Sequence, residues 1–187
     1  MATPFVIKSI ETILTDHHVY FYEFIDGEMT EMLFLINTID PGSDCLHLHM
    51  NNCGGSIHAG TQVLFALEEA MKSGVRVVLY IESICESMAA VFVCKVINMG
   101  AEVHMGDGQY LMFHNVSIEG STGPCTNVFK DAQATKELYE HILVSWCKPI
   151  LTDEEITNIL NGVELYMPPG VLLERIKAII PEGETVH

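Results

Sequence analysis

The sequence is short of positive charge. Lysine and arginine together number 9 among 187 residues, whereas aspartate and glutamate number 25, and the formal net charge is -16 at pH 7. Binding to a nucleic-acid backbone needs clustered lysine and arginine to neutralise the phosphates. The composition therefore argues against a nucleic-acid partner.

The chain also lacks segments that direct a protein into or across a membrane. No apolar run reaches about 18 residues, and no basic segment followed by an apolar core opens the sequence. The six cysteines include no C-x-x-C pair. Without a secretion signal we expect them to be reduced thiols that mostly fill the core. The sequence thus predicts a cytoplasmic protein with no membrane partner.

Hydrophobic residues, in contrast, make up 49% of the chain, and the mean hydropathy is +0.27. This apolar content is high for a soluble monomer, so we expect some apolar surface to be buried between subunits of a homo-oligomer. The length suits one domain with a sizeable core. We find no repeat, low-complexity tract or linker, and we predict a single domain over residues 1–187.

Predicted strands and helices alternate after a short N-terminal arm, which is typical of a layered α/β fold. Strands are predicted at residues 19–24, 45–50, 75–81, 109–114, 164–167 and 177–180. Helices are predicted at residues 28–39, 59–74, 88–100, 126–146, 151–162 and 168–176. The strand at 75–81 is nearly all apolar, as in a central strand covered on both faces. Thr152 and Glu155 form a capping-box signature.

Four histidines invite a test for metal binding. His47 and His49 share one face of the predicted strand 45–50 and form an H-x-H pair, but no further ligands are evident in the sequence. We interpret His17 and His18 as solvated loop residues. The sequence therefore predicts no metal site.

Ser87 stands where a predicted strand gives way to a predicted buried helix, directly after Glu86. One interpretation is an N-cap, which local sequence alone favours. The other is a nucleophile, because the unpaired N–H groups of a helix start create a positive field that favours an alkoxide and can hold an oxyanion.

Two further features are candidates for the same chemistry. Gly54 and Gly55 lie between a strand and a helix, and paired glycines let the backbone approach a ligand closely and turn an N–H into a pocket. They lack the Walker lysine and the G-x-G-x-x-G spacing, which disfavours a phosphate site. His114 ends the strand 109–114, and it matters only if the fold brings it to Ser87.

The segments "NNCGGSIHAG", "ESMAA" and "MFHN" occur in an order and at separations that resemble the ClpP family of self-compartmentalising serine peptidases. The family's pattern is N-x-P-G-G-x-x-x-A-G, then A-S-M-G-A, then M-I-H-Q-P, and the resemblance runs from about Val19 to Ile180. It implies an α/β fold of the ClpP/crotonase type, a spiral of ββα units. It also implies a protruding handle at about residues 115–147 and an N-terminal arm at residues 1–18.

Carried over by this resemblance, Ser87 is the nucleophile and His114 the general base. Gly55 and Met88 match the two N–H donors of the oxyanion hole. Glu164 falls where the family has the aspartate of the triad. A glutamate can serve, since the carboxylate only has to hold the imidazole and stabilise its cation.

The motifs also depart from the family's pattern. Glu86 stands beside the nucleophile where the family has a small residue, and a carboxylate near the imidazole would raise the histidine pKa unless it points away, as we expect. Cys53 replaces the proline before the paired glycines. Should Glu164 be out of reach, Asp153, Glu154 or Glu155 are less natural substitutes.

The resemblance implies a serine endopeptidase that cleaves unfolded proteins or peptides inside a chamber of stacked rings, with heptamers expected and no metal or organic cofactor required. In the family the N-terminal region helps dock a ring-shaped AAA+ unfoldase. The arm of 18 residues before the first predicted strand is shorter than usual, which argues against an unfoldase partner.

Three alternatives stay open from the sequence. The first is a catalytically inactive, structural or regulatory ring subunit, which the diluted motifs would also suit. The crotonase family of acyl-CoA enzymes shares the expected fold, but the co-occurrence of Ser87 and His114 counts against it. The third alternative is a cysteine nucleophile at Cys85 paired with His114.

Overall fold

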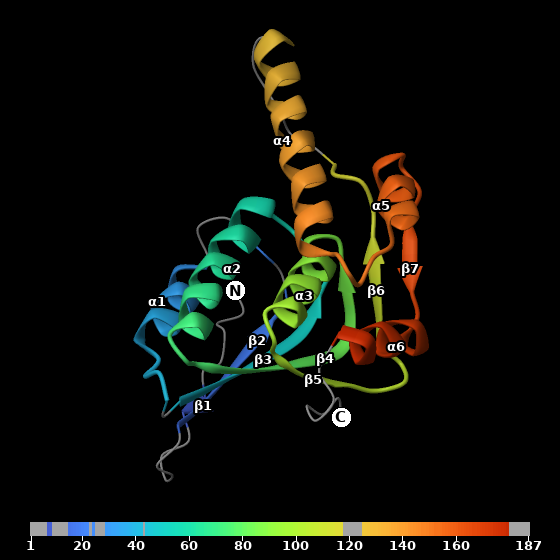
Figure 1. The fold of residues 1–187 in the computed structure, drawn as a ribbon. Coiled ribbons are helices and arrows are strands. Elements are labelled where there is room, and N and C mark those ends of the chain that lie inside the picture. The colour runs from blue at the N-terminus through green and yellow to red at the C-terminus, as the bar shows by residue number, and fades with distance from the viewer. Residues whose placement is uncertain are drawn as a thin grey trace.

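The protein is described by a computed structural model, which covers residues 7–8, 15–22, 24, 29–42, 44–117 and 125–179. Within these ranges the fold is mixed α/β, with one sheet of seven strands and six helices (Figure 1). The strands are β1 (Ile7–Lys8), β2 (Thr15–Phe21), β3 (Asp44–Asn52), β4 (Arg76–Glu86), β5 (Glu102–Met105), β6 (Tyr110–Phe113) and β7 (Leu165–Met167). The helices are α1 (Thr30–Thr38), α2 (Ile57–Lys72), α3 (Met88–Asn98), α4 (Cys125–Trp146), α5 (Asp153–Leu160) and α6 (Pro169–Ile179).

The strand β4 is the centre of the sheet, whose order is β1-β2-β3-β4-β6-β7. The pairings between β2, β3, β4, β5 and β6 are parallel, whereas β1 and β7 add to the edges antiparallel. On one side β4 pairs first with β5, over residues 78–81, and then with β6, over residues 84–86. The carboxyl end of β4 therefore lies beside the carboxyl end of β6.

The helices α1, α2 and α3 lie together on one side of the sheet (Figure 1). Alternate residues of β3, such as Leu46 and Leu48, are fully buried on that side, and the residues between them are half-buried on the other. The helix α3 is buried at nine of its eleven positions, as its all-round apolar sequence predicts. The core therefore lies between α2, α3 and one face of the sheet.

The helix α4 extends away from the sheet (Figure 1). Its buried residues, Tyr139, Ile142 and Leu143, all lie in its last eight positions. Phe129, near its start, is exposed. Only the C-terminal third of α4 is therefore anchored in the core.

Several predicted elements are confirmed, among them α2, α3 and α4 within two residues at each end. Thr152 and Glu155 form the predicted capping box, in which the Thr152 N–H donates to Glu155 Oε2 at 2.8 Å. Gly74 follows the end of α2 with φ 106°, consistent with the predicted C-cap role. All six cysteines are free, and four of them are buried.

Other predictions were wrong. Residues 177–179 of the predicted closing strand belong to α6, because Leu172 and Ile176 continue its buried helical face; residue 180 lies outside the described ranges. β2 begins at Thr15, so His17 and His18 are strand residues, not loop residues. The short strands β1 and β5 were not predicted.

The predicted central strand is covered on both faces only in part. Residues 77–79 of β4 are all buried, but Tyr80 is half-buried and Glu82 is exposed. The predicted strand at 19–24 ends at Phe21, and Phe24 makes an isolated bridge instead. Of the predicted N-terminal arm, residues 1–6 and 9–14 lie outside the described ranges, as do residues 118–124 of the predicted handle.

None of the helices in the described ranges has the length and apolar character needed to cross a membrane.

Candidate catalytic site

Ser87 forms the junction between β4 and α3 with an unusual backbone. Its φ is 56° and its ψ is -124°, and it is the one residue other than glycine with a positive φ in the described part of the chain. It occupies the N-cap position, yet its side chain makes no capping hydrogen bond. Its N–H donates to Met112 O of β6 at 2.8 Å. The capping role that local sequence favours is therefore not fulfilled.

This conformation is strained for a residue with a Cβ atom. A sharp turn from strand to helix with a positive φ lifts the side chain out of the sheet at the start of the helix, as in the nucleophile elbow of unrelated hydrolases. The Ser87 hydroxyl is thereby presented at the N-terminus of a buried helix.

The loop Gly54–Gly55 packs directly on this turn. Both glycines have positive φ, 99° and 122°. A Cβ atom on Gly54 would lie 2.7 Å from Ser87 Cβ and 3.1 Å from Met88 N. Such contacts are too short for any side chain, so glycine is required for this close approach.

Phe24 clamps the same loop from the other side. Its N–H donates to Gly54 O at 2.8 Å, and its carbonyl accepts from Ser56 N at 2.8 Å. A Cβ atom on Gly55 would collide with the Phe24 carbonyl oxygen. The loop Gly54–Gly55 is therefore held between Phe24 and Ser87.

Two backbone N–H groups beside Ser87 are free to bind an anion. Met88 is the first residue of α3, so its N–H has no acceptor within the helix. The bridge at Gly55 uses the N–H groups of Phe24 and Ser56 but not its own. In the part of the chain that the structure covers, neither the Gly55 nor the Met88 N–H donates a hydrogen bond outside a helix or strand. Both therefore suit the oxyanion role that the resemblance implies.

The register of the sheet brings His114 to the same edge as Ser87. Glu86 pairs with Met112 across β4 and β6, and Ser87 and His114 follow directly at the carboxyl ends of these neighbouring strands. No hydrogen bond joins their side chains among the described residues. The fold thus places Ser87 and His114 at the ends of neighbouring strands, but their side chains are not hydrogen-bonded to each other in this state.

Contacts from two helices hold His114 and its neighbour Asn115. The Tyr139 hydroxyl of α4 donates to His114 O at 2.6 Å, and Asn115 Nδ2 donates to Leu160 O at 2.9 Å. His114 Nδ1 lies 2.6 Å from Asn115 O, and a carbonyl can only accept. Nδ1 therefore carries a proton, and in the neutral imidazole Nε2 then has the lone pair that a general base needs.

Glu164 lies opposite His114 when the register of β6 and β7 is continued by one residue from the pair Phe113–Leu165. Directly opposed residues of antiparallel strands point to the same side of the sheet. The exposed Glu164 carboxylate instead accepts a hydrogen bond from the Tyr166 hydroxyl at 3.1 Å. In this state Asn115 O, not Glu164, orients the imidazole.

The alternative carboxylates are occupied elsewhere or exposed. Glu155 accepts from both terminal nitrogens of Arg175, at 2.7 and 2.8 Å, and Arg175 holds its pKa below the usual range. Asp153 pairs with Lys148, and Glu154 is exposed in the same first turn of α5.

Two tyrosines that sequence reasoning missed bind the acidic residues around the site. The Tyr110 hydroxyl donates to Glu86 Oε1 at 3.0 Å, and this bond raises the Tyr110 pKa. Its ring lies 6.1 Å from that of Tyr166, which holds Glu164. The sequence does place each tyrosine on a predicted strand. Their proximity depends on the register of β6 and β7, which the sequence does not reveal.

Cys85 is unsuited to be a nucleophile. It is fully buried, and burial raises its pKa to about 12. A thiolate is the reactive form of cysteine, so this environment keeps Cys85 as an inert thiol. Burial and the raised pKa therefore argue against the cysteine-nucleophile alternative.

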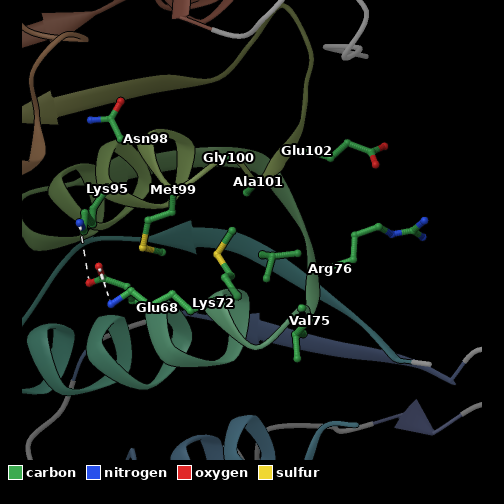
Figure 2. Close-up of a pocket in the computed structure, with 13 residues that line it drawn as sticks. Glu68, Lys72, Val75, Arg76, Lys95, Asn98, Met99, Gly100, Ala101 and Glu102 are labelled. Atoms are coloured by element: carbon green, nitrogen blue, oxygen red, sulfur yellow. Dashed lines mark ion pairs between the residues drawn. The ribbon is translucent and has the colours of Figure 1, made fainter. Parts of the chain in front are cut away.

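A cavity of about 860 Å³ lies elsewhere, at the ends of α2 and α3. Figure 2 shows Lys72 and Lys95 of its wall paired with Glu68. Arg76 and Glu102 complete its charged lining. Its lysines are already neutralised, and Ser87 is not among its lining residues, so the cavity is separate from the catalytic candidates.

Neither the protein-family models nor the curated proteins contain a match to this chain.

Proposed function

We propose that this chain is a cytoplasmic serine endopeptidase of the ClpP type, which cleaves unfolded proteins or peptides. The backbone of Ser87 is the observation that carries this proposal. A positive φ at a residue with a Cβ atom is strained by about 1–3 kcal/mol, and the hydroxyl makes no capping bond in return. A nucleophile presented at a helix N-terminus requires this kind of backbone turn, so a catalytic role would explain why the strained conformation is present.

In the proposed reaction His114 Nε2 removes the Ser87 proton as the hydroxyl attacks the peptide carbonyl. The N–H groups of Gly55 and Met88 hold the oxyanion that forms. The imidazolium then protonates the leaving amine, and water reverses the sequence to release the acyl group. Asn115 O keeps Nδ1 protonated, and Glu164 can take over that contact if Tyr166 releases it.

The proposal extends to the ClpP/crotonase spiral and to ring assembly. The parallel strands with intervening helices and the projection of α4, as the handle, support the fold. Exposed phenylalanines on the packed pair α1 and α2, Phe34 at 70% and Phe65 at 68%, support burial between subunits, and we propose that these subunits form stacked, heptameric rings.

An inactive ring subunit is the second candidate. It is favoured by the missing hydrogen bond between Ser87 and His114, and by the contacts that His114 and Glu164 make with other groups. Catalytic hydrogen bonds are often absent before substrate binds, which is why we rank this candidate second.

Intact-mass spectrometry after treatment with a fluorophosphonate separates the two candidates. We expect one adduct on the wild type, none on Ser87→Ala, and labelling at least about 100-fold slower on His114→Ala, since general-base catalysis contributes that much. His141→Ala, which changes an exposed histidine of α4, is the matched control and should label normally. Assembled wild-type protein that takes no adduct would favour the inactive subunit.

Glu164→Gln tests the third member of the triad in the same assay. If Asn115 O suffices to orient the imidazole, labelling slows less than about 10-fold. If Glu164 replaces it during the reaction, labelling slows by more, since the stabilisation of the imidazolium is lost.

A further inference from the structure

The face of the sheet opposite α2 and α3 carries a layer of stacked imidazole and phenol rings. His18 stacks on His47 at 4.4 Å between ring centroids, and His49 lies between Tyr20 and Tyr80 at 4.3 and 4.5 Å. His18 Nδ1 lies 3.0 Å from His49 Nε2. The H-x-H pair of β3 is thus part of a layer drawn from three strands.

Three different ligand groups meet at one end of this layer. Asp16 pairs with Cys45 across β2 and β3, and His47 is two residues further along the same face. A carboxylate oxygen of Asp16, the Cys45 sulfur and a ring nitrogen of His47 all lie within 4.8 Å of one another. Asp16 Oδ1 and His47 Nε2 are 3.3 Å apart.

We propose that Asp16, Cys45 and His47 form a binding site for a zinc ion. Zinc bonds of about 2.0–2.3 Å place tetrahedral ligand atoms about 3.3–3.8 Å apart. The ligand atoms here lie within 4.8 Å of one another, so the widest separation has to close by no more than about 1 Å. Thiolate and imidazole ligands select zinc over magnesium and calcium, which prefer oxygen.

Charge balance and a second layer of contacts support this site. Ionised Asp16 and Cys45 would together neutralise the two charges of the ion. His47 Nδ1 lies 3.1 Å from the Tyr80 hydroxyl, a partner of the kind that orients a ligating imidazole. Burial raises the Cys45 pKa, so the zinc ion itself would have to displace the thiol proton. Arg76, from the wall of the cavity in Figure 2, donates to Cys45 Sγ at 3.4 Å and offsets part of this rise.

The three ligands differ in exposure. The Asp16 side chain is 43% exposed, whereas Cys45 is buried, so Asp16 lies on the solvent side of the site and the sulfur on its inner side. Three protein ligands leave the fourth position to water. Cys45 pairs with Arg76, the first residue of β4, whereas Ser87 follows the last, so the zinc site is independent of the proposed peptidase site.

Titration of the full chain with Co²⁺, after removal of metals by a chelator, tests the proposal. We expect one Co²⁺ per chain, with the charge-transfer absorption that a thiolate ligand produces, and displacement by Zn²⁺. Cys45→Ser should abolish the absorption and weaken Zn²⁺ binding more than about 100-fold, since even loss of an outer contact costs 10–100-fold. Cys125→Ser changes an exposed cysteine and should leave both unchanged.

Two further variants and one control keep the test valid if Cys45→Ser fails to fold. His47→Asn should lose the ion, whereas His141→Asn on α4 should not. Tyr80→Phe retains all three ligands and should weaken Zn²⁺ about 10-fold through the lost contact to His47. A wild type without the thiolate absorption, or absorption that survives Cys45→Ser and disappears in Cys125→Ser, would overturn the proposal.

Discussion

The two candidate sites lie near opposite ends of β4 and differ in the groups that form them. At its carboxyl end, after Glu86, the candidate catalytic site depends on backbone conformation, with positive φ at Gly54, Gly55 and Ser87. At its amino end, the candidate zinc site depends on side chains that the sheet register aligns. The catalytic candidate requires glycines at fixed positions, because no residue with a Cβ atom fits there, and these glycines form a recognisable sequence motif. The ligands of the zinc candidate come from separate strands, so they form no local sequence motif.

The largest effect should come from the glycine loop. Gly55→Ala combines the strain of a positive φ, about 1–2 kcal/mol, with a collision against the Phe24 carbonyl, about 1–3 kcal/mol. Gly74→Ala has the strain but no atom within 4 Å of the new Cβ. Urea unfolding should therefore show a loss of stability roughly twice as large for Gly55→Ala. Equal losses would mean that the clamp by Phe24 does not exist.

An intermediate effect is expected at Glu155, which combines a local cap with a distant ion pair. Glu155→Gln should destabilise the protein by about 1–2 kcal/mol at pH 7, after allowance for partial exposure. Arg175 lowers the Glu155 pKa from 4.5, so the carboxylate stabilises the fold fully above about that pH. The stabilisation is lost as the pH falls through the lower folded-state pKa.

Urea midpoints of the wild type and Glu155→Gln at pH 7 and at pH 3 check this expectation. The gap between the two proteins should narrow in acid. Glu154→Gln, at the exposed neighbouring position, should show little gap at either pH. A gap of constant size would exclude the ion pair as its source.

The smallest change in stability is expected for substitutions at Ser87, and it tests whether this residue caps α3. Ser87→Gly should stabilise the fold by about 0.5–1 kcal/mol, since glycine adopts a positive φ without strain but loses more chain entropy. Ser87→Ala should change stability little, whereas loss of a true N-cap costs about 1 kcal/mol. Thermal unfolding of both variants measures this, and a marked loss in Ser87→Ala would restore the capping role.

The same contrast explains what could be predicted. Thr152 and Glu155 are three residues apart, and the motifs at Gly54 and Ser87 are contiguous, so local sequence revealed them. Asp16 and Cys45 are neighbours only through strand pairing, and His18 was mistaken for a loop residue. Register depends on distant packing, which a single sequence does not specify. The strand predicted at 177–180 failed because its short apolar run is ambiguous between strand and helix.

The anchoring of His114 has a consequence for how the chain matures. The Tyr139 hydroxyl holds the His114 carbonyl, and Leu160 O holds the side chain of the neighbouring Asn115. Synthesis delivers the N-terminal part of a chain first, so Ser87 leaves the ribosome before Tyr139 and Leu160. A nascent chain that has already exposed Ser87 would therefore lack the contacts that anchor His114. In the proposed peptidase this delay would keep the general base out of place until the chain is nearly complete.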